Sequence, residues 1–344
     1  MYWLDPLHDP RWAVFVENHA HSSIFHEPCW LEALQKTYGF LPMAVTATPP
    51  GRELENGIVF CRVDRWLTGR CLVSLPFSDH CNALIANRAE LQYLLGQLQN
   101  HLKSDGLKYC ELRPASASLP DSNPFAEWRP AGEYVLHTLD LRRELDELKA
   151  GFHKNCVLRK IRSAEQNHLV CEEGREESHL AKFYQLQLRT RRRHHLPTQP
   201  FSWFRILAES MGERLTVRIA SLERRPVAAI LTLAHKHTVV YKYGASDERY
   251  HRLGGTQLLL WKAIQDAKSR GALEFDFGRS DHDNPGLAVF KDRWGAVRRP
   301  LTYYRSHEER EVAEKGIRMA RRIALRLPGW MVARMGRYVY RHFA

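Results

Sequence analysis

The chain has 344 residues, of which 44% are hydrophobic and 26% are charged. This composition is typical of a soluble globular protein and argues against a disordered, collagen-like or multi-span membrane protein. A chain of this length usually forms two domains rather than a single core.

The formal net charge is +12, and it is unevenly distributed along the chain. Residues 1–150 carry 14 Lys/Arg and 19 Asp/Glu, a balance of −5, whereas residues 151–344 carry 37 and 20, a balance of +17. The basic second part predicts a polyanionic partner: nucleic acid, an anionic membrane or a phosphate-rich cofactor.

The start of the chain lacks the lysines and the long apolar run of a signal peptide. No stretch approaches the ~18 to 20 apolar residues that span a bilayer. The seven cysteines are odd in number and never spaced CxxC, which predicts neither a disulfide framework nor a zinc site. We therefore expect a cytoplasmic protein with reduced thiols and no metal.

Hydrophobic periodicity predicts alternating helices and strands in the first part of the chain. Helices are expected over 10–20, 28–38 and 88–103, and strands over 41–47, 57–63, 70–76, 107–113 and 133–140. A loop rich in Pro, Ser and Ala, 114–130, separates the last two strands. These elements predict an N-terminal α/β domain over residues 1–140, followed by a charged helical bridge over 141–166.

The second part of the chain repeats this alternation. Helices are expected over 177–193, 201–211 and 254–270, and strands over 215–222, 226–234, 238–245, 273–277 and 300–305. Antiparallel strands followed by a crossover helix and a further strand predict a mixed sheet, so residues 167–306 are expected to form a second α/β domain.

Residues 307–344 are expected to form a basic amphipathic helical tail. Its last part, 315–344, carries eight basic residues and no acidic one. Trp330 and Met331 interleave with arginines, a pattern that suits an anionic membrane surface or a partner groove. The membrane interpretation would place the protein peripherally at the inner face of a membrane, through residues 308–344. The alternative is a helix packed on its own domain with arginines facing water.

Two basic clusters could hold an anion. Asn155 and Arg159 lie four residues apart on one face of a predicted helix, where an amide and a guanidinium can bind phosphate or carboxylate. Arginines and histidines crowd residues 189–195, including Arg189 and Arg191. A helix dipole explains one or two cations at a helix end, and nucleotide phosphates or RNA would explain the rest.

A third segment precedes the long helix. Gly254 and Gly255 allow backbone N–H groups to approach phosphate oxygens at the helix start. The spacing fits neither the P-loop nor the dinucleotide fingerprint. It is similar to the Arg/Gln-x-x-Gly-x-Gly/Ala pyrophosphate loop of N-acetyltransferases, with Arg252 and Gly255 in place and Gln257 where that loop has Gly or Ala.

A fourth segment contains Asp276, which interrupts an apolar strand. An acid there is costly to bury unless it is paired or functional. A kinase interpretation of Asp-Phe-Gly fails because the chain has no Gly-rich loop and no His-Arg-Asp. The run 281–284 is interpreted as a polar loop before a Pro285-Gly286 turn, which returns Lys291 to the end of the strand. Asp276 and Lys291 are then either catalytic groups or a buried ion pair.

The order of these segments resembles that of the FemAB-like acyltransferases of the GNAT superfamily, in the version seen in polysaccharide and exosortase-associated gene sets. The resemblance covers about 150 to 305. It rests on Asn155…Arg159, Arg189-Thr190-Arg191, Tyr241-x-Tyr243, Leu258-Leu259-Leu260-Trp261, Asp276-Phe277-Gly278 and Phe290-Lys291-x-x-x-Gly295. Residues 24–30 and 75–80 look like the first domain of the same group, and whether Asp79 and His80 line its cleft stays open.

The resemblance implies two tandem GNAT-like mixed-sheet domains and transfer of an acyl group to an amine. The expected donor is acyl-CoA and the expected acceptor is related to the cell envelope or a polysaccharide. Aminoacyl-tRNA, the donor of FemAB proteins proper, is the alternative, as is a non-catalytic protein that binds RNA or an anionic membrane.

Acyl transfer needs an uncharged amine, a polarised carbonyl and a protonated leaving group. We expect Asp276 to be the base or orienting group, Lys291 the positive charge at the carbonyl or the donor phosphates, and Tyr243 the acid. The donor phosphates are expected to contact Asn155, Arg159, Arg189, Arg191, Arg252, Gly254 and Gly255.

Overall fold

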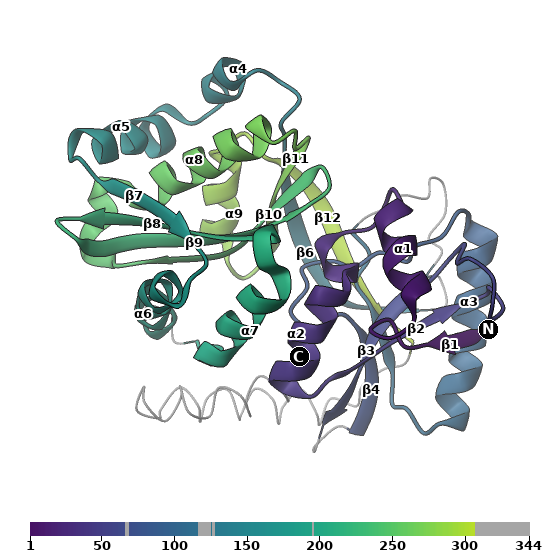
Figure 1. Ribbon diagram of the computed structural model, residues 1–344. Helices are drawn as coiled ribbons and strands as arrows, with labels where there is room; N and C mark the ends of the chain where they lie inside the picture. Colours follow the sequence, from purple (N-terminus) through teal and green to yellow (C-terminus); the bar gives the residue numbers. More distant parts are fainter. Residues whose placement is uncertain (66–68, 116–124, 126–127, 195, 307–344) are drawn as a thin grey trace. The chain divides into compact units, whose positions relative to one another are not determined.

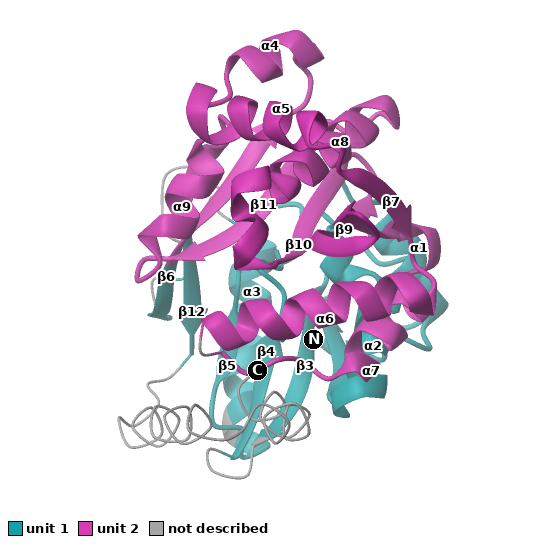
Figure 2. Cartoon of the chain, turned by 90° about the vertical axis from the view of Figure 1, so that its left-hand side faces the viewer, with its two compact units in different colours: residues 1–133, 300–344 teal, residues 134–299 magenta. Residues whose placement is uncertain are grey.

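The computed structural model describes residues 1–65, 69–115, 125, 128–194 and 196–306. The chain divides into two compact units (Figure 1, Figure 2): unit 1 is residues 1–133 with the chain from 300 onward, and unit 2 is residues 134–299. The expected tail helix over 307–344 and His195 lie outside the described residues.

Unit 1 is built on a mixed sheet with the strand order β1-β2-β3-β4-β5-β12. Its neighbours are antiparallel except β4 and β5, which are parallel and joined through a crossover helix, α3. The elements are β1 (Tyr2–Leu4), α1 (Pro10–Asn18), η1 (Ile24–His26), α2 (Pro28–Tyr38), β2 (Leu41–Thr46), β3 (Ile58–Arg65), β4 (Gly69–Ser74), α3 (Arg88–Ser104), β5 (Cys110–Leu112) and β12 (Val297–Arg305).

Unit 2 is also built on a mixed arrangement of strands, in the order β6-β11-β10-β9-β8-β7. β10 and β11 are parallel and joined through α8, whereas the other pairs are antiparallel. The elements are β6 (Arg129–Asp140), α4 (Leu145–Ala150), η2 (Lys154–Leu158), α5 (Arg159–Gln166), β7 (Val170–Gly174), α6 (Glu177–Arg193), α7 (Phe201–Met211), η3 (Gly212–Arg214), β8 (Leu215–Leu222), β9 (Arg225–His235), β10 (Thr238–Ser246), η4 (Glu248–Leu253), α8 (Gly255–Ser269), β11 (Glu274–Asp281) and α9 (Pro285–Asp292).

The predicted mixed α/β architecture is confirmed, and one local expectation is wrong. Pro285 and Gly286, expected to form a turn, begin helix α9. Proline suits the first helical position because the N–H that it lacks has no partner there, and the Asn284 side chain accepts the Leu287 N–H at 3.3 Å. Lys291 therefore returns to β11 on a helix.

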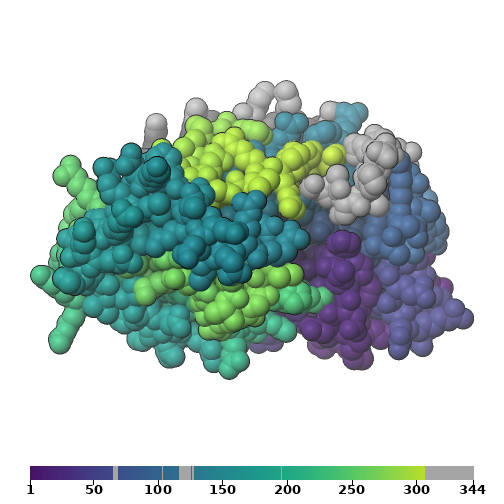
Figure 3. Space-filling model, turned by 90° about the horizontal axis from the view of Figure 1, so that it is seen from above, coloured from purple at the N-terminus to yellow at the C-terminus, as the bar shows by residue number. Residues whose placement is uncertain are grey.

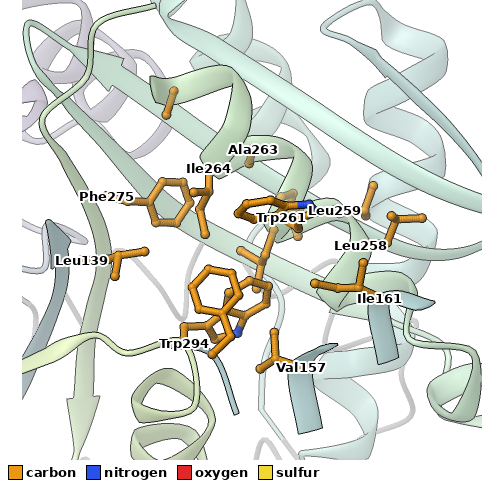
Figure 4. Close-up of a cluster of buried hydrophobic side chains, with 14 of the residues drawn as sticks. Leu139, Val157, Ile161, Leu258, Leu259, Trp261, Ala263, Ile264, Phe275 and Trp294 are labelled. Carbon is orange, nitrogen blue, oxygen red and sulfur yellow. The ribbon is translucent and has the colours of Figure 1, made fainter. Parts of the chain in front are cut away.

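Helices α5 and α8 cover one face of the unit 2 sheet, and the core lies beneath them (Figure 4). Its members come from β6, η2, α5, α8, β11 and the turn after α9: Leu139, Val157, Ile161, Leu258, Leu259, Trp261, Ala263, Ile264, Phe275 and Trp294. The segment 141–166, expected as a bridge, contributes Leu148 and Phe152 to this core and belongs to unit 2. Figure 3 shows this segment, in dark teal, on the surface of unit 2.

A buried carboxylate between two arginines ties together the sheet of unit 1. Glu111 is 3% exposed, and its two oxygens lie 2.8 Å from Nη2 of Arg113 and 2.7 Å from Nη2 of Arg305. Burial alone would raise the pKa of Glu111, but the two guanidinium groups outweigh it and lower the pKa to about 2. Arg113 also donates to the carbonyl oxygens of Leu75 and Ser78, at 2.6 and 3.4 Å, and so fixes the turn that carries Asp79 and His80.

The described helices include none that is both long enough and apolar enough to cross a membrane.

Glu111→Gln should destabilise the protein by about 3–5 kcal/mol, because it leaves two largely buried guanidinium groups without their carboxylate. The contribution of Glu111, about 3 kcal/mol, should be fully present above its ordinary pKa of 4.5 and should be lost as the pH falls through about 2. Chemical unfolding at several pH values measures both effects. Glu32→Gln, which removes a surface pair with Lys36, is the control and should cost less than about 1 kcal/mol. Equal losses for both variants would contradict this account.

Candidate active site

The parallel strands β10 and β11 separate in the middle of the unit 2 sheet. In the described chain their ladder joins Thr238–Val240 to Glu274–Asp276. Beyond it, β10 continues to Ser246 and β11 to Asp281. The ladder thus ends while both strands continue, so beyond it the facing edges of β10 and β11 are not paired with each other.

Both strands are irregular where they separate. In β10, Tyr241 pairs with Thr232 of β9 and Tyr243 with Leu231, so Lys242 is left out of the register. In β11, Asp276 pairs with Thr138 of β6 and Arg279 with Leu136, so Phe277 and Gly278 lie opposite the single residue His137. Bulges bend a strand and often lie next to active sites.

Asp276 and Lys291 meet at the bulge in β11. Asp276 is 2% exposed, and its Oδ1 accepts the N–H of Gly278 at 2.6 Å. Lys291 is also 2% exposed, and its Nζ donates to the carbonyl oxygens of Gly278 and Arg279 at 2.8 and 2.7 Å. Gly278 has a φ of +73°, which a residue with a side chain rarely adopts. The two charged groups therefore hold the bulged backbone segment from both sides.

Tyr243 lies on the same face of the sheet as Asp276. Its hydroxyl accepts a hydrogen bond from Nε1 of Trp203 at 3.0 Å, and its ring packs against Phe183 of α6 and Phe204 of α7. Phe275 packs in the core under α8, so the next residue, Asp276, points to the opposite face, towards α6 and α7. The structure thus brings two of the three expected catalytic side chains to one face.

The loop before α8 is shaped by close contact with α5. Gly254 has a φ of +80°, and a Cβ there would collide with the carbonyl of Lys160. A Cβ on Gly255 would meet Cβ of Ala228 at 3.1 Å. These two positions therefore require glycine for backbone conformation and for close approach.

Lys160 holds the loop from the α5 side. Its Nζ donates to the carbonyl oxygens of His251 and Arg252, at 3.1 and 3.0 Å. Asn155 and Arg159, the residues expected to bind phosphate in this segment, are exposed on η2 and at the start of α5. Sequence reasoning missed Lys160 because its role depends on packing between segments about ninety residues apart.

Side chains at the end of α6 contact the residues between β10 and the loop before α8. Arg189 forms an ion pair with Asp247, which also binds Arg249 at 2.6 Å. The backbone of Ser246 both donates to and accepts from the hydroxyl of Thr190, at 2.9 and 3.1 Å. Arg189 thus serves a contact within the protein, whereas Arg191 is half-buried and Arg252 is exposed.

His251 occupies the junction of these contacts. Its Nε2 lies 2.8 Å from the hydroxyl of Ser246 and 3.2 Å from Nη1 of Arg193. A guanidinium only donates, so this nitrogen accepts and the ring is neutral. Burial and the charge of Arg193 lower the pKa of His251, in agreement with the geometry. Sequence reasoning did not single out this histidine, although it lies next to Arg252.

Asp79 and His80 belong to unit 1 and are half-buried there. The hydroxyl of Tyr303 donates to the carbonyl of Asp79 at 2.7 Å. Among the described residues, no group of three or more His, Cys, Asp or Glu side chains could hold a metal ion.

Gly254→Ala should destabilise the protein more than Gly271→Ala does. Both glycines have a φ near +80°, but a Cβ on Gly271 meets nothing within 4 Å, whereas one on Gly254 meets backbone atoms of α5. The left-handed conformation should cost each variant about 1–2 kcal/mol, and the collision should add about 1–3 kcal/mol for Gly254→Ala. Thermal unfolding of the two proteins measures the difference. Equal midpoints would show that α5 does not pack against the loop as described.

Residues 152–292 match the family model of the acetyltransferase (GNAT) domain. Among solved structures, the chain is similar to FemX, with a TM-score of 0.69 and 14% identity, over 91% of this chain and 99% of that one. It is also similar to the C-terminal domain of a putative lysylphosphatidylglycerol synthetase from Agrobacterium fabrum, with a TM-score of 0.56 and 15% identity, over 92% and 95% of the two chains.

A third similar structure is a tandem GNAT protein from the clavulanic acid biosynthesis pathway, with a TM-score of 0.52 and 12% identity, over 87% of this chain and 95% of that one. A search of curated proteins gave no match. The family match and the shared fold support the resemblance predicted from the order of motifs: residues 152–292 match the GNAT acetyltransferase domain, and the chain has the fold seen in FemX and in a tandem GNAT protein.

Proposed function

We propose that unit 2 transfers an acyl group from acyl-CoA to an amine of a cell-envelope or polysaccharide-related acceptor. The observation that carries this proposal is the separation of β10 and β11 beyond Val240 and Asp276. β10 is followed along the chain by η4, by the loop at Gly254 and Gly255, and by the start of α8. The edge of β10 is therefore followed closely by the N-terminus of a helix.

An extended thioester donor suits this arrangement. The amide-rich arm of coenzyme A can add its hydrogen bonds to the edge of β10 beyond Val240, as an extended peptide adds to a sheet. The donor phosphates can then reach the N–H groups at the start of α8. In this proposal Arg252 and Arg191 contact these phosphates, and Asn155 and Arg159 add polar and positive groups on the α5 side.

Arg189 and Lys160 have a different part in this proposal. Both make contacts within the protein that fix the loop: Arg189 through Asp247, and Lys160 through two backbone carbonyls. They would keep the loop in a binding conformation before the donor arrives, which lowers the entropy lost on binding.

The chemistry assigned to the site is nucleophilic attack of a neutral amine on the thioester carbonyl. The C–N bond forms and the C–S bond breaks, Asp276 accepts or orients the amine proton, and Tyr243 gives a proton to the leaving thiolate. The N–H of Lys242, which the bulge takes out of the register with β9, is a candidate donor to the oxyanion. Lys291 supports this site through the peptide oxygens of Gly278 and Arg279.

A second candidate is aminoacyl transfer from aminoacyl-tRNA. It is favoured by the similarity to FemX over nearly the whole of both chains and by Gln257, which replaces the Gly or Ala of the acetyltransferase loop. The basic end of α6 suits the phosphates of either donor. The expected membrane contact through residues 308–344 stays a separate proposal, because that segment lies outside the described residues.

Replacing Arg252 or Arg191 with alanine should weaken binding of coenzyme A about tenfold or more for each lost phosphate contact, with the fold unchanged. Calorimetry with coenzyme A, acetyl-CoA and uncharged tRNA measures this and also separates the two candidate donors. Arg205→Ala, which removes an exposed arginine of α7, is the matched control for loss of charge. Wild-type affinity for every donor in both variants would remove these arginines from the site.

Asp276→Asn should lower kcat by about 10²-fold or more and leave the KM for the donor unchanged, because the amide cannot take a proton but can still accept the Gly278 N–H. Steady-state kinetics and thermal unfolding are measured on the same preparation. If Asp276 serves only to compensate a buried lysine, the variant should instead lose about 3–5 kcal/mol of stability and keep its activity.

A further inference from the structure

His137 is a buried polar side chain that the proposed chemistry does not use. It lies on β6, is 0% exposed, and stands opposite the Phe277–Gly278 bulge of β11. Its Nε2 is 3.4 Å from Oδ1 of Asp292, but the geometry is not that of a hydrogen bond, and the described residues give neither ring nitrogen a hydrogen-bond partner. A buried nitrogen without a partner destabilises a fold, so an apolar side chain would suit this position better on structural grounds alone.

Charged side chains of α9 lie near His137. Lys291 and Asp292 come from this helix, and Asp292 also binds Arg298 at 2.5 and 2.8 Å. Burial and the charge of Lys291 lower the pKa of His137, so the ring is neutral at neutral pH. A neutral imidazole can lie beside an ammonium group without repulsion.

His137 and Asp276 lie on opposite faces of the sheet. Leu139, two residues after His137, packs in the core under α5 and α8, so the two side chains share that face. Asp276 pairs with Thr138 and shares its face, which is the other one. His137 therefore reaches the bulge from behind, on the side from which α9 packs, and a substrate bound on the face of Asp276 does not touch it.

We propose that His137 is a positioning residue, which fixes how α9 packs against the bulge of β11. This packing lets Lys291 hold the Gly278 peptide and keeps the side chain of Asp276 in its orientation. This inference rests on the proposed acyl transfer at Asp276. It explains an imidazole where packing alone favours a hydrocarbon: the ring fills the space opposite two bulged residues and meets Asp292, the neighbour of Lys291.

His137→Leu tests the proposal because structural and positioning roles predict opposite results. The variant removes a nitrogen that has no partner, so its unfolding midpoint should equal or exceed that of the wild type. Its kcat should fall about tenfold or more, with the KM for the donor unchanged, because the donor loop is not altered. His137→Gln, which restores a polar end near Asp292, should recover part of kcat.

His26→Leu is the matched control in unit 1. His26 is equally buried, but its ring nitrogens bond to Ser23 and to the carbonyl of Asn82 at 3.0 and 2.9 Å. This variant should lower the unfolding midpoint and leave the kcat of the folded protein unchanged.

A second measurement does not depend on activity. The Gly278 amide donates to Asp276, so its hydrogen exchange reports on the bulge directly, and it should be faster in His137→Leu than in the wild type. Wild-type kcat and wild-type exchange in His137→Leu would overturn the proposal, as would a kcat loss that only follows a lowered midpoint. If the wild-type protein transfers no acyl group, the proposed function fails, and the exchange at Gly278 still decides whether His137 supports the bulge. Should His137→Leu not fold, the same exchange is read on His137→Gln.

Discussion

The site depends on how the peptide groups around Gly278 are held. A bulge takes backbone donors and acceptors out of the sheet ladder, and buried backbone groups need partners elsewhere. Here the carboxylate of Asp276 accepts the N–H of Gly278, and the ammonium group of Lys291 donates to the carbonyls of Gly278 and Arg279. These buried charges compensate the bulge, and the bulge lies where β10 and β11 separate. Asp276 and Lys291, which the sequence suggests act on a substrate, thus form hydrogen bonds with the backbone of the bulge.

The loop before α8 is likewise held by contacts with neighbouring helices. Its two glycines allow α5 to pack against it, Lys160 holds two of its carbonyls, and α6 holds Ser246 and Asp247 at its start. Cations that look equivalent in the sequence therefore divide into those that support the loop, such as Arg189, and those exposed beside it, such as Arg252. Contacts within the protein make the loop rigid, whereas an exposed cation can still bind a ligand.

Much of the fold could be predicted, because helices such as α6 and strands such as β8 show clear hydrophobic periods. Helix α9 was missed, since Pro and Gly next to each other resemble a turn unless the Asn284 cap is noticed. A candidate site residue can be selected from the sequence where it breaks a local rule, as Asp276 does by interrupting an apolar strand. Lys160 and His137 could not be assigned, because their roles come from contacts with distant segments.

Hydrogen exchange of the whole protein with and without coenzyme A tests the central claim most directly, since the claim is that the donor binds along β10 beyond its ladder with β11 and at the start of α8. The account predicts that the donor slows exchange in Lys242–Ser246 and Gly255–Gln257, and leaves the ladder residues Thr238–Val240 as slow as before. Binding of coenzyme A without protection of β10, or with protection confined to unit 1, would contradict it.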